Sequence, residues 1–138
     1  MFSTRSGDYG IPDPELAYRN ERNARLAQFL QKPGDRIHYS YDFGDGWEHD
    51  IVLEKRLNPE PGAQMPACLA GKGACPPEAC GGPWGYADLK EALADPRHEY
   101  HEGMLDWLGL DTAERFDPAA CDLAEINEAL GLTVATRR

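Results

Sequence analysis

The stretch YSYDFGDGWEHDIVLEK, residues 39–55, decides the fold. Apolar and polar residues alternate on both sides of its Gly-Asp-Gly centre, a pattern typical of a β-hairpin. A three-residue turn over residues 44–46, with its last glycine in the left-handed conformation, sets Phe43 opposite Trp47 and gathers the apolar side chains on one face. The sequence therefore predicts a hairpin over residues 37–54.

The other face of this hairpin is acidic. The predicted register sets Asp42 opposite Glu48, and two carboxylates in that position destabilise a sheet unless an arginine, a cation or solvent offsets them. Asp42 and Glu48 are therefore candidates for an interaction surface that receives a basic partner.

The segments around the hairpin alternate between helix signals and turn residues. Residues 2–10 could form one short strand or be frayed. Asp13-Pro14 is a helix start, which predicts a helix that ends before Pro33-Gly34. Further helices are predicted at residues 86–94, from Asp95-Pro96 to about residue 108, and at residues 123–130. The fold class is α+β, with an antiparallel sheet around the central hairpin (37–54) and short helices packed on one face, in a single domain over residues 1–138.

The charge of the chain is strongly negative. The formal net charge is −10, and residues 37–130 carry six Lys or Arg against nineteen Asp or Glu. Nucleic-acid binding needs clustered cations, so an autonomous DNA-binding role is disfavoured. An acidic surface instead favours solubility and the binding of basic protein partners. No apolar run is long enough to span a bilayer, and the N-terminus carries no signal-peptide pattern. We expect a cytoplasmic protein without membrane contact.

Residues 58–85 form a long loop rich in Pro, Gly and Cys, and long loops are usually functional or held by a constraint. Thiolates and imidazole are preferred Zn²⁺ ligands, which makes a zinc site an alternative. The candidate ligands are Cys68, Cys75, Cys80 and His49. The C-x6-C-x4-C spacing is not that of a zinc knuckle, so thiols packed as small apolar groups are the competing interpretation.

Two aromatic residues lie where this loop ends and the next predicted helix begins. Trp84 and Tyr86 lie in GGPWGY, residues 81–86, where a tight turn would seat both rings against the sheet. If the rings stay exposed, they mark a binding surface instead. His98, His101 and Glu102 are close enough on a helix to bind a cation, but a solvated helix face is the favoured interpretation. A cysteine nucleophile lacks surrounding cations, because Lys72 is the only basic residue in the loop.

Four runs of the sequence resemble a known family. They are YDFGDGWEHDIVLEK, CLAGKGACPPEACGGPWGY, LADPRHEYHEGMLDWLG and FDPAACDLAEINEAL, and the resemblance extends from about Tyr9 to Leu130. The chain is similar to plasmid pRiA4b ORF-3-like proteins, some of which are labelled TnpR-type proteins or resolvases of mobile elements. The resemblance implies no settled activity. Recombinase chemistry is disfavoured, because the arginines do not group around a Ser or Tyr.

The resemblance also sets an expectation for assembly. Family members have a strand, a helix and a further strand before the YG-PDPE segment, and this chain starts near the second of those strands. A missing strand leaves a sheet edge open, which predicts a homodimer or a strand swap. Together these features predict a non-catalytic interaction or accessory module linked to mobile elements, with an unknown protein partner and with zinc binding as the alternative.

Overall fold

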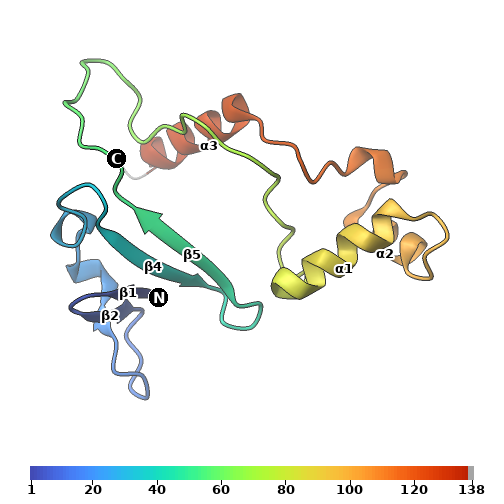
Figure 1. Cartoon of the computed structure of the whole chain (residues 1–138), viewed down its shortest axis with the longest axis horizontal. Helices are drawn as coiled ribbons and strands as arrows, with labels where there is room; N and C mark the ends of the chain where they lie inside the picture. Colours follow the sequence, from blue (N-terminus) through green and yellow to red (C-terminus); the bar gives the residue numbers. More distant parts are fainter. Residues whose placement is uncertain (137–138) are drawn as a thin grey trace. The chain divides into compact units, whose positions relative to one another are not determined.

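The computed structural model describes residues 1–136 (Figure 1). The chain consists of two compact units. Unit 1 comprises Met1–Asn58 and Gly81–Pro83, and unit 2 comprises Pro59–Cys80 and Trp84–Arg138. Unit 1 holds a five-stranded sheet and the α helices follow it in the sequence, so the predicted α+β class is confirmed. The single domain and the packing of helices on one sheet face stay predictions.

The sheet of unit 1 is mixed, with strand order β3-β2-β1-β4-β5. Neighbouring strands are antiparallel except β2 and β3, which run parallel. The N-terminal segment contributes two strands where the sequence predicted at most one. The strands are β1 (Phe2–Thr4), β2 (Gly7–Gly10), β3 (Arg19–Asn20), β4 (Arg36–Tyr41) and β5 (Trp47–Val52).

The central hairpin forms, but the predicted register is wrong by two residues. Tyr41, not Phe43, lies opposite Trp47, and the connection is a five-residue loop over residues 42–46. Asp42 adopts a left-handed φ of 53° and its carboxylate accepts hydrogen bonds from the backbone N–H groups of the next residues, so it ends the strand. A shift of two residues preserves the faces, and the left-handed Gly46 is confirmed at φ 70°.

The predicted helix after Asp13-Pro14 is absent from the structure. β3 and two 3-10 turns, Glu21–Asn23 and Leu26–Gln28, take its place. The backbone of β3 pairs with β2, and the Asn20 side chain accepts from Arg22 N at 3.0 Å. Backbone groups that would bond within the predicted helix therefore bond to β2 and to the Asn20 side chain instead. The Tyr18 ring also packs directly against Gly10, so a larger residue at position 10 would have little room beside the ring.

Three α helices follow: α1 (Gly82–Ala94), α2 (His101–Leu108) and α3 (Leu123–Thr136). Helix α1 starts four residues before the predicted start, and α2 starts later than predicted because Asp95-Pro96 begins a turn. Gly109 ends α2 in the left-handed conformation, as expected. Asp122 caps α3, but this helix continues past Gly131 to Thr136. Leu89, Leu93 and Leu105 form the buried core that joins α1 to α2.

Residues 58–81 contain no helix or strand, as the long-loop prediction expects; the last four residues of the predicted loop belong to α1. In unit 2, Asn127 of α3 holds this loop. Its Oδ1 accepts from Cys68 N at 2.6 Å, and its Nδ2 donates to Cys68 O at 2.9 Å. The amide therefore satisfies the backbone of Cys68 as a neighbouring strand would.

Candidate functional site

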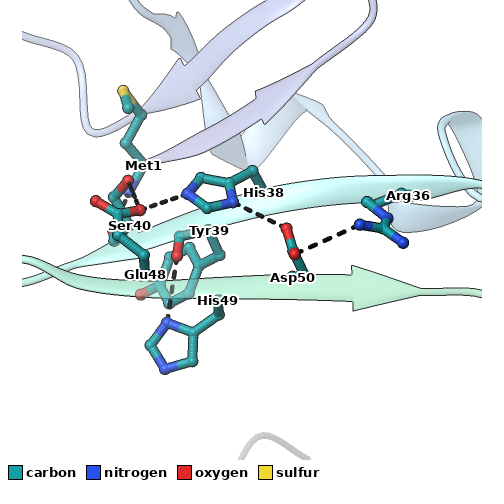
Figure 2. A network of polar contacts seen from close by, with 8 residues as sticks. All are labelled: Met1, Arg36, His38, Tyr39, Ser40, Glu48, His49 and Asp50. Atoms are coloured by element: carbon teal, nitrogen blue, oxygen red, sulfur yellow. Dashed lines mark hydrogen bonds and ion pairs between the residues drawn. The ribbon is translucent and has the colours of Figure 1, made fainter.

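A network of polar side chains covers one face of the β4–β5 hairpin (Figure 2). His38 lies between two carboxylates of β5: Nδ1 is 3.1 Å from Asp50 Oδ1, and Nε2 is 2.5 Å from Glu48 Oε2. Ser40 Oγ donates to the same Glu48 oxygen at 2.7 Å, and Arg36 pairs with Asp50 at 3.5 Å. The corrected register therefore sets Ser40, not Asp42, opposite Glu48, and the expected like-charge pair does not exist.

The three ionisable groups of this network stabilise one another in their charged forms. Hydrogen bonds to Asp50 and then to Glu48 raise the pKa of His38 above its ordinary value. The hydrogen bond from Ser40, followed by that from His38, lowers the pKa of Glu48, while the hydrogen bond from His38 lowers the pKa of Asp50. The arrangement favours an imidazolium that donates from both ring nitrogens to carboxylates.

This geometry serves cohesion better than catalysis. Both nitrogens of His38 are engaged, so neither has a lone pair available for a metal or for a substrate proton while the network is intact. The contacts cross from β4 to β5 and tie the two strands together. Glu48, a predicted interaction residue, has its contacts inside the network, and its role in binding stays a prediction.

The hairpin loop displays an aromatic ring on a well-anchored backbone. Asp42 accepts from Gly44 N at 3.1 Å and from Asp45 N at 3.3 Å, and Asp45 Oδ2 accepts from Gly81 N. Phe43 stands between these anchored residues, and 65% of it is exposed. An exposed large apolar side chain on a fixed backbone is a recurrent feature of interaction sites.

A groove lies at this end of the sheet. Its volume is about 470 Å³, and Phe43, Tyr41 and Ile11 line it together with the ends of β2 and β4. Ile11 is 78% exposed and Tyr41 is 41% exposed. The carboxylates of the lining come from Asp13, Glu21 and Asp42. The groove thus combines apolar walls with negative charge. Sequence reasoning missed Ile11, because its part of the lining depends on where β2 ends relative to β4, with β1 between the two strands.

The predicted zinc ligands fall in two separate units. His49 is in unit 1, where its Nδ1 donates to Tyr39 O at 3.2 Å. The four cysteines are not in disulfides, and Cys68 and Cys75 contact nearby backbone carbonyls. Across residues 1–136, no three His, Cys, Asp or Glu side chains are grouped so that they could hold a metal ion. Zinc binding stays a prediction.

Trp84 and Tyr86 have different environments. The predicted tight turn is instead the first part of α1, where Trp84 is 85% exposed. The Tyr86 ring packs edge-on against the Phe116 ring, with 6.4 Å between the two ring centroids. Lys90 Nζ lies 4.6 Å from the centroid of the Tyr86 ring. Burial, followed by the charges of Cys80 and Cys75, raises the pKa of the Tyr86 phenol. Tyr86 is a core residue of unit 2, whereas Trp84 meets the stated condition for a binding surface.

The solvated-face interpretation of residues 98–102 is wrong for His101. This side chain is buried, and its Nδ1 donates to Ala92 O at 2.8 Å, which connects α2 to the end of α1. A further structural residue that the sequence did not indicate is Asn127, since a single asparagine on a helix gives no signal of a loop 59 residues away. Within residues 1–136, no helix combines the length and apolar character needed to cross a membrane.

The comparisons with known proteins agree with one another. The family model of the plasmid pRiA4b ORF-3-like protein matches residues 1–125. An uncharacterized protein, y4hQ, of Sinorhizobium fredii is 41% identical over 132 residues, which cover 94% of this chain and 66% of the relative's length. The chain thus spans slightly less than two thirds of that relative.

A solved structure is also similar. The crystal structure of MM3350, a protein of unknown function from Methanosarcina mazei Go1, matches with a TM-score of 0.74 and 33% identity, over 90% of this chain and 70% of that one. The sequence comparison and the structural comparison are therefore consistent, and both relatives are described as proteins without a known function. The chain belongs to the plasmid pRiA4b ORF-3-like protein family.

Proposed function

We propose that this protein is a non-catalytic interaction module that binds a basic partner protein through the groove at the end of the unit 1 sheet. The observation that carries the proposal is the joint exposure of Ile11, Tyr41 and Phe43 along one groove. Isolated exposed apolar residues are ordinary, but three along one hollow favour an interaction site.

The chemistry of the partner follows from the groove. Its apolar walls suit an aromatic or branched aliphatic anchor, and the carboxylates of Asp13, Glu21 and Asp42 suit flanking lysine or arginine residues. The net charge of −10 extends this preference, because it attracts cationic partners and repels phosphate backbones. The anchored backbone around Phe43 lowers the entropy lost when a partner binds.

The family supports a biological setting. Its description names a plasmid open reading frame, which favours a role as an accessory protein of a mobile element. We therefore expect the partner among the basic proteins encoded by the same element. Binding measured pairwise between this chain and each such protein tests the setting, and failure of every pair removes it.

A peptide selection tests the groove itself. Random peptides displayed on phage and selected on the full chain are expected to share an apolar anchor flanked by Lys or Arg. Their affinity should fall about tenfold in Phe43→Ala, because a central anchor of an interface contributes roughly 1–2 kcal/mol or more. Leu57→Ala is the matched control, since Leu57 is an exposed apolar residue of the same unit that does not line the groove. Equal binding to both variants, or no enriched peptide, refutes the proposal.

A further inference from the structure

We propose that unit 1 has a second binding site, which takes a small apolar molecule that carries a carboxylate. The site is a cavity of about 290 Å³ between the apolar face of the sheet and the two 3-10 turns that follow β3. The inference does not depend on the groove at the end of the sheet, because a different set of observations carries it. Its lining includes Phe2, Tyr9, Ile37, Phe29, Arg22 and Arg25.

The walls of the cavity are apolar and held in place. Phe2, Tyr9 and Ile37 come from β1, β2 and β4, and Ile37 is only 2% exposed. The Tyr9 ring lies 5.2 Å from the Phe29 ring between centroids, so the covering segment is fixed to the sheet beside the cavity. A preformed apolar cavity with a small number of polar groups is the usual form of a small-molecule site.

The charged side chains at this cavity are Glu21 and two arginines, Arg22 and Arg25. Arg5 and Arg36 of unit 1 pair with carboxylates, whereas within residues 1–136 no carboxylate lies at ion-pair distance from the guanidinium of Arg22 or Arg25. Arg19, Arg56 and Arg97 likewise have no carboxylate at ion-pair distance among the described residues, so what distinguishes Arg22 and Arg25 is their place on the lining of an apolar cavity.

The charge at the cavity selects the ligand class. Glu21 also lines it, so the charged side chains of the lining sum to one positive charge. Guanidinium groups bind carboxylates through paired, charge-assisted hydrogen bonds. An apolar body against the sheet and a carboxylate beside Arg22 and Arg25 satisfy both features of the cavity.

The cavity volume sets the size of the probe. An engineered cavity of about 150 Å³ holds benzene, which has six heavy atoms. A cavity of about 290 Å³ therefore suits roughly twice that number. Decanoate, with ten carbons including that of its carboxylate, is a suitable probe, and decyltrimethylammonium has an alkyl chain of similar length with the opposite charge.

The test titrates each probe into the ¹⁵N-labelled full chain and follows the amide resonances. Decanoate is expected to bind one molecule per chain and to shift resonances around Phe29 and Ile37. The variant Arg22→Gln/Arg25→Gln should weaken decanoate binding at least tenfold, because charge-assisted hydrogen bonds are the stronger class. The variant Ala24→Phe, which fills the cavity and keeps both arginines, should also abolish binding.

The control is Lys55→Gln/Arg97→Gln, which changes the net charge by the same amount away from the cavity and should bind decanoate like the wild type. Circular dichroism establishes that each variant is folded. Equal affinity in the two double variants overturns the proposal, as does equal binding of decyltrimethylammonium. Resonance shifts scattered over both units, which indicate adsorption to exposed apolar residues, overturn it as well.

Discussion

The Asn127 amide offers the sharpest test of how the long loop is held. Its side chain makes two hydrogen bonds with the backbone of Cys68, at 2.6 and 2.9 Å, and both groups are half-buried. Asn127→Ala removes both bonds and leaves the Cys68 N–H and C=O groups without this partner. Asn127→Asp keeps the acceptor for the Cys68 N–H group but loses the donor to the carbonyl.

The magnitude can be worked out from these contacts. Each neutral hydrogen bond contributes about 1 kcal/mol to the free energy of unfolding, so the loss of two costs about 2 kcal/mol. Alanine is a better helix former than asparagine by roughly 0.6 kcal/mol, which offsets part of the loss in α3. We expect Asn127→Ala to lower the free energy of unfolding by about 1.4 kcal/mol. Asn127→Asp should lower it by about 1 kcal/mol, with little change in helix propensity.

The assay combines urea unfolding, followed by circular dichroism, with hydrogen exchange at the Cys68 amide. That amide should exchange faster in Asn127→Ala than in Asn127→Asp, since only the aspartate retains an acceptor for it. Asn58→Ala is the matched control, because Asn58 is an exposed asparagine at the start of the loop. An Asn127→Ala variant within about 0.3 kcal/mol of the wild type, with unchanged exchange at Cys68, would refute the reasoning.

Three further predictions concern the hairpin and the cysteine loop. The contribution of His38 to stability should be complete below its ordinary pKa of 6.5 and should decline as the pH rises through its raised pKa, while that of Asp50 should decline as the pH falls below 3.8. In a plot of the urea midpoint against pH, measured from pH 3 to pH 9, His38→Gln should therefore flatten the decline at alkaline pH. Ile37→Ala should cost about 2–4 kcal/mol in the free energy of unfolding, whereas Phe43→Ala should stay within about 0.5 kcal/mol, and equal losses would contradict the observed register. The zinc hypothesis predicts about one zinc ion per chain by elemental analysis of protein purified without an affinity tag, and a folded, metal-free protein removes it.

Alternation along the sequence was enough to predict the hairpin and its two faces, because the side-chain period of a strand is two. It was not enough to place the register. The faces of a hairpin are the same for a three-residue loop and for a five-residue loop, so only the left-handed Asp42 distinguishes them. Aspartate adopts that conformation when its carboxylate can bond to the following backbone, and the pattern does not reveal this.

Helix signals were reliable where packing supported them and misleading elsewhere. Asp122 precedes a real helix, and its carboxylate caps it. Asp13 also accepts a backbone hydrogen bond two residues ahead, but no apolar stripe follows and β3 pairs with β2 instead. A cap motif thus specifies a local turn, and contacts distant in the sequence decide whether a helix follows.

The candidate groove was only partly accessible to sequence reasoning. Asp42 was identified as a surface residue through a register argument that proved wrong, yet it does line the groove. Ile11 lies after β2, and its proximity to Phe43 follows from the order of strands in the sheet. No spacing rule connects residues 11 and 43. The cavity beside Arg22 was equally inaccessible to sequence reasoning, because the two 3-10 turns that line it replace the helix that the sequence predicted.

The strand order of unit 1 has a consequence for how this unit folds. β1–β2 and β4–β5 are each local pairings that can form within microseconds. They are joined by one antiparallel seam, in which Phe2 lies opposite Tyr39 and their rings stack at 4.5 Å. Closing that seam brings together residues 37 positions apart, so we expect its loop-closure entropy, and not the speed of either local pairing, to set the kinetic barrier.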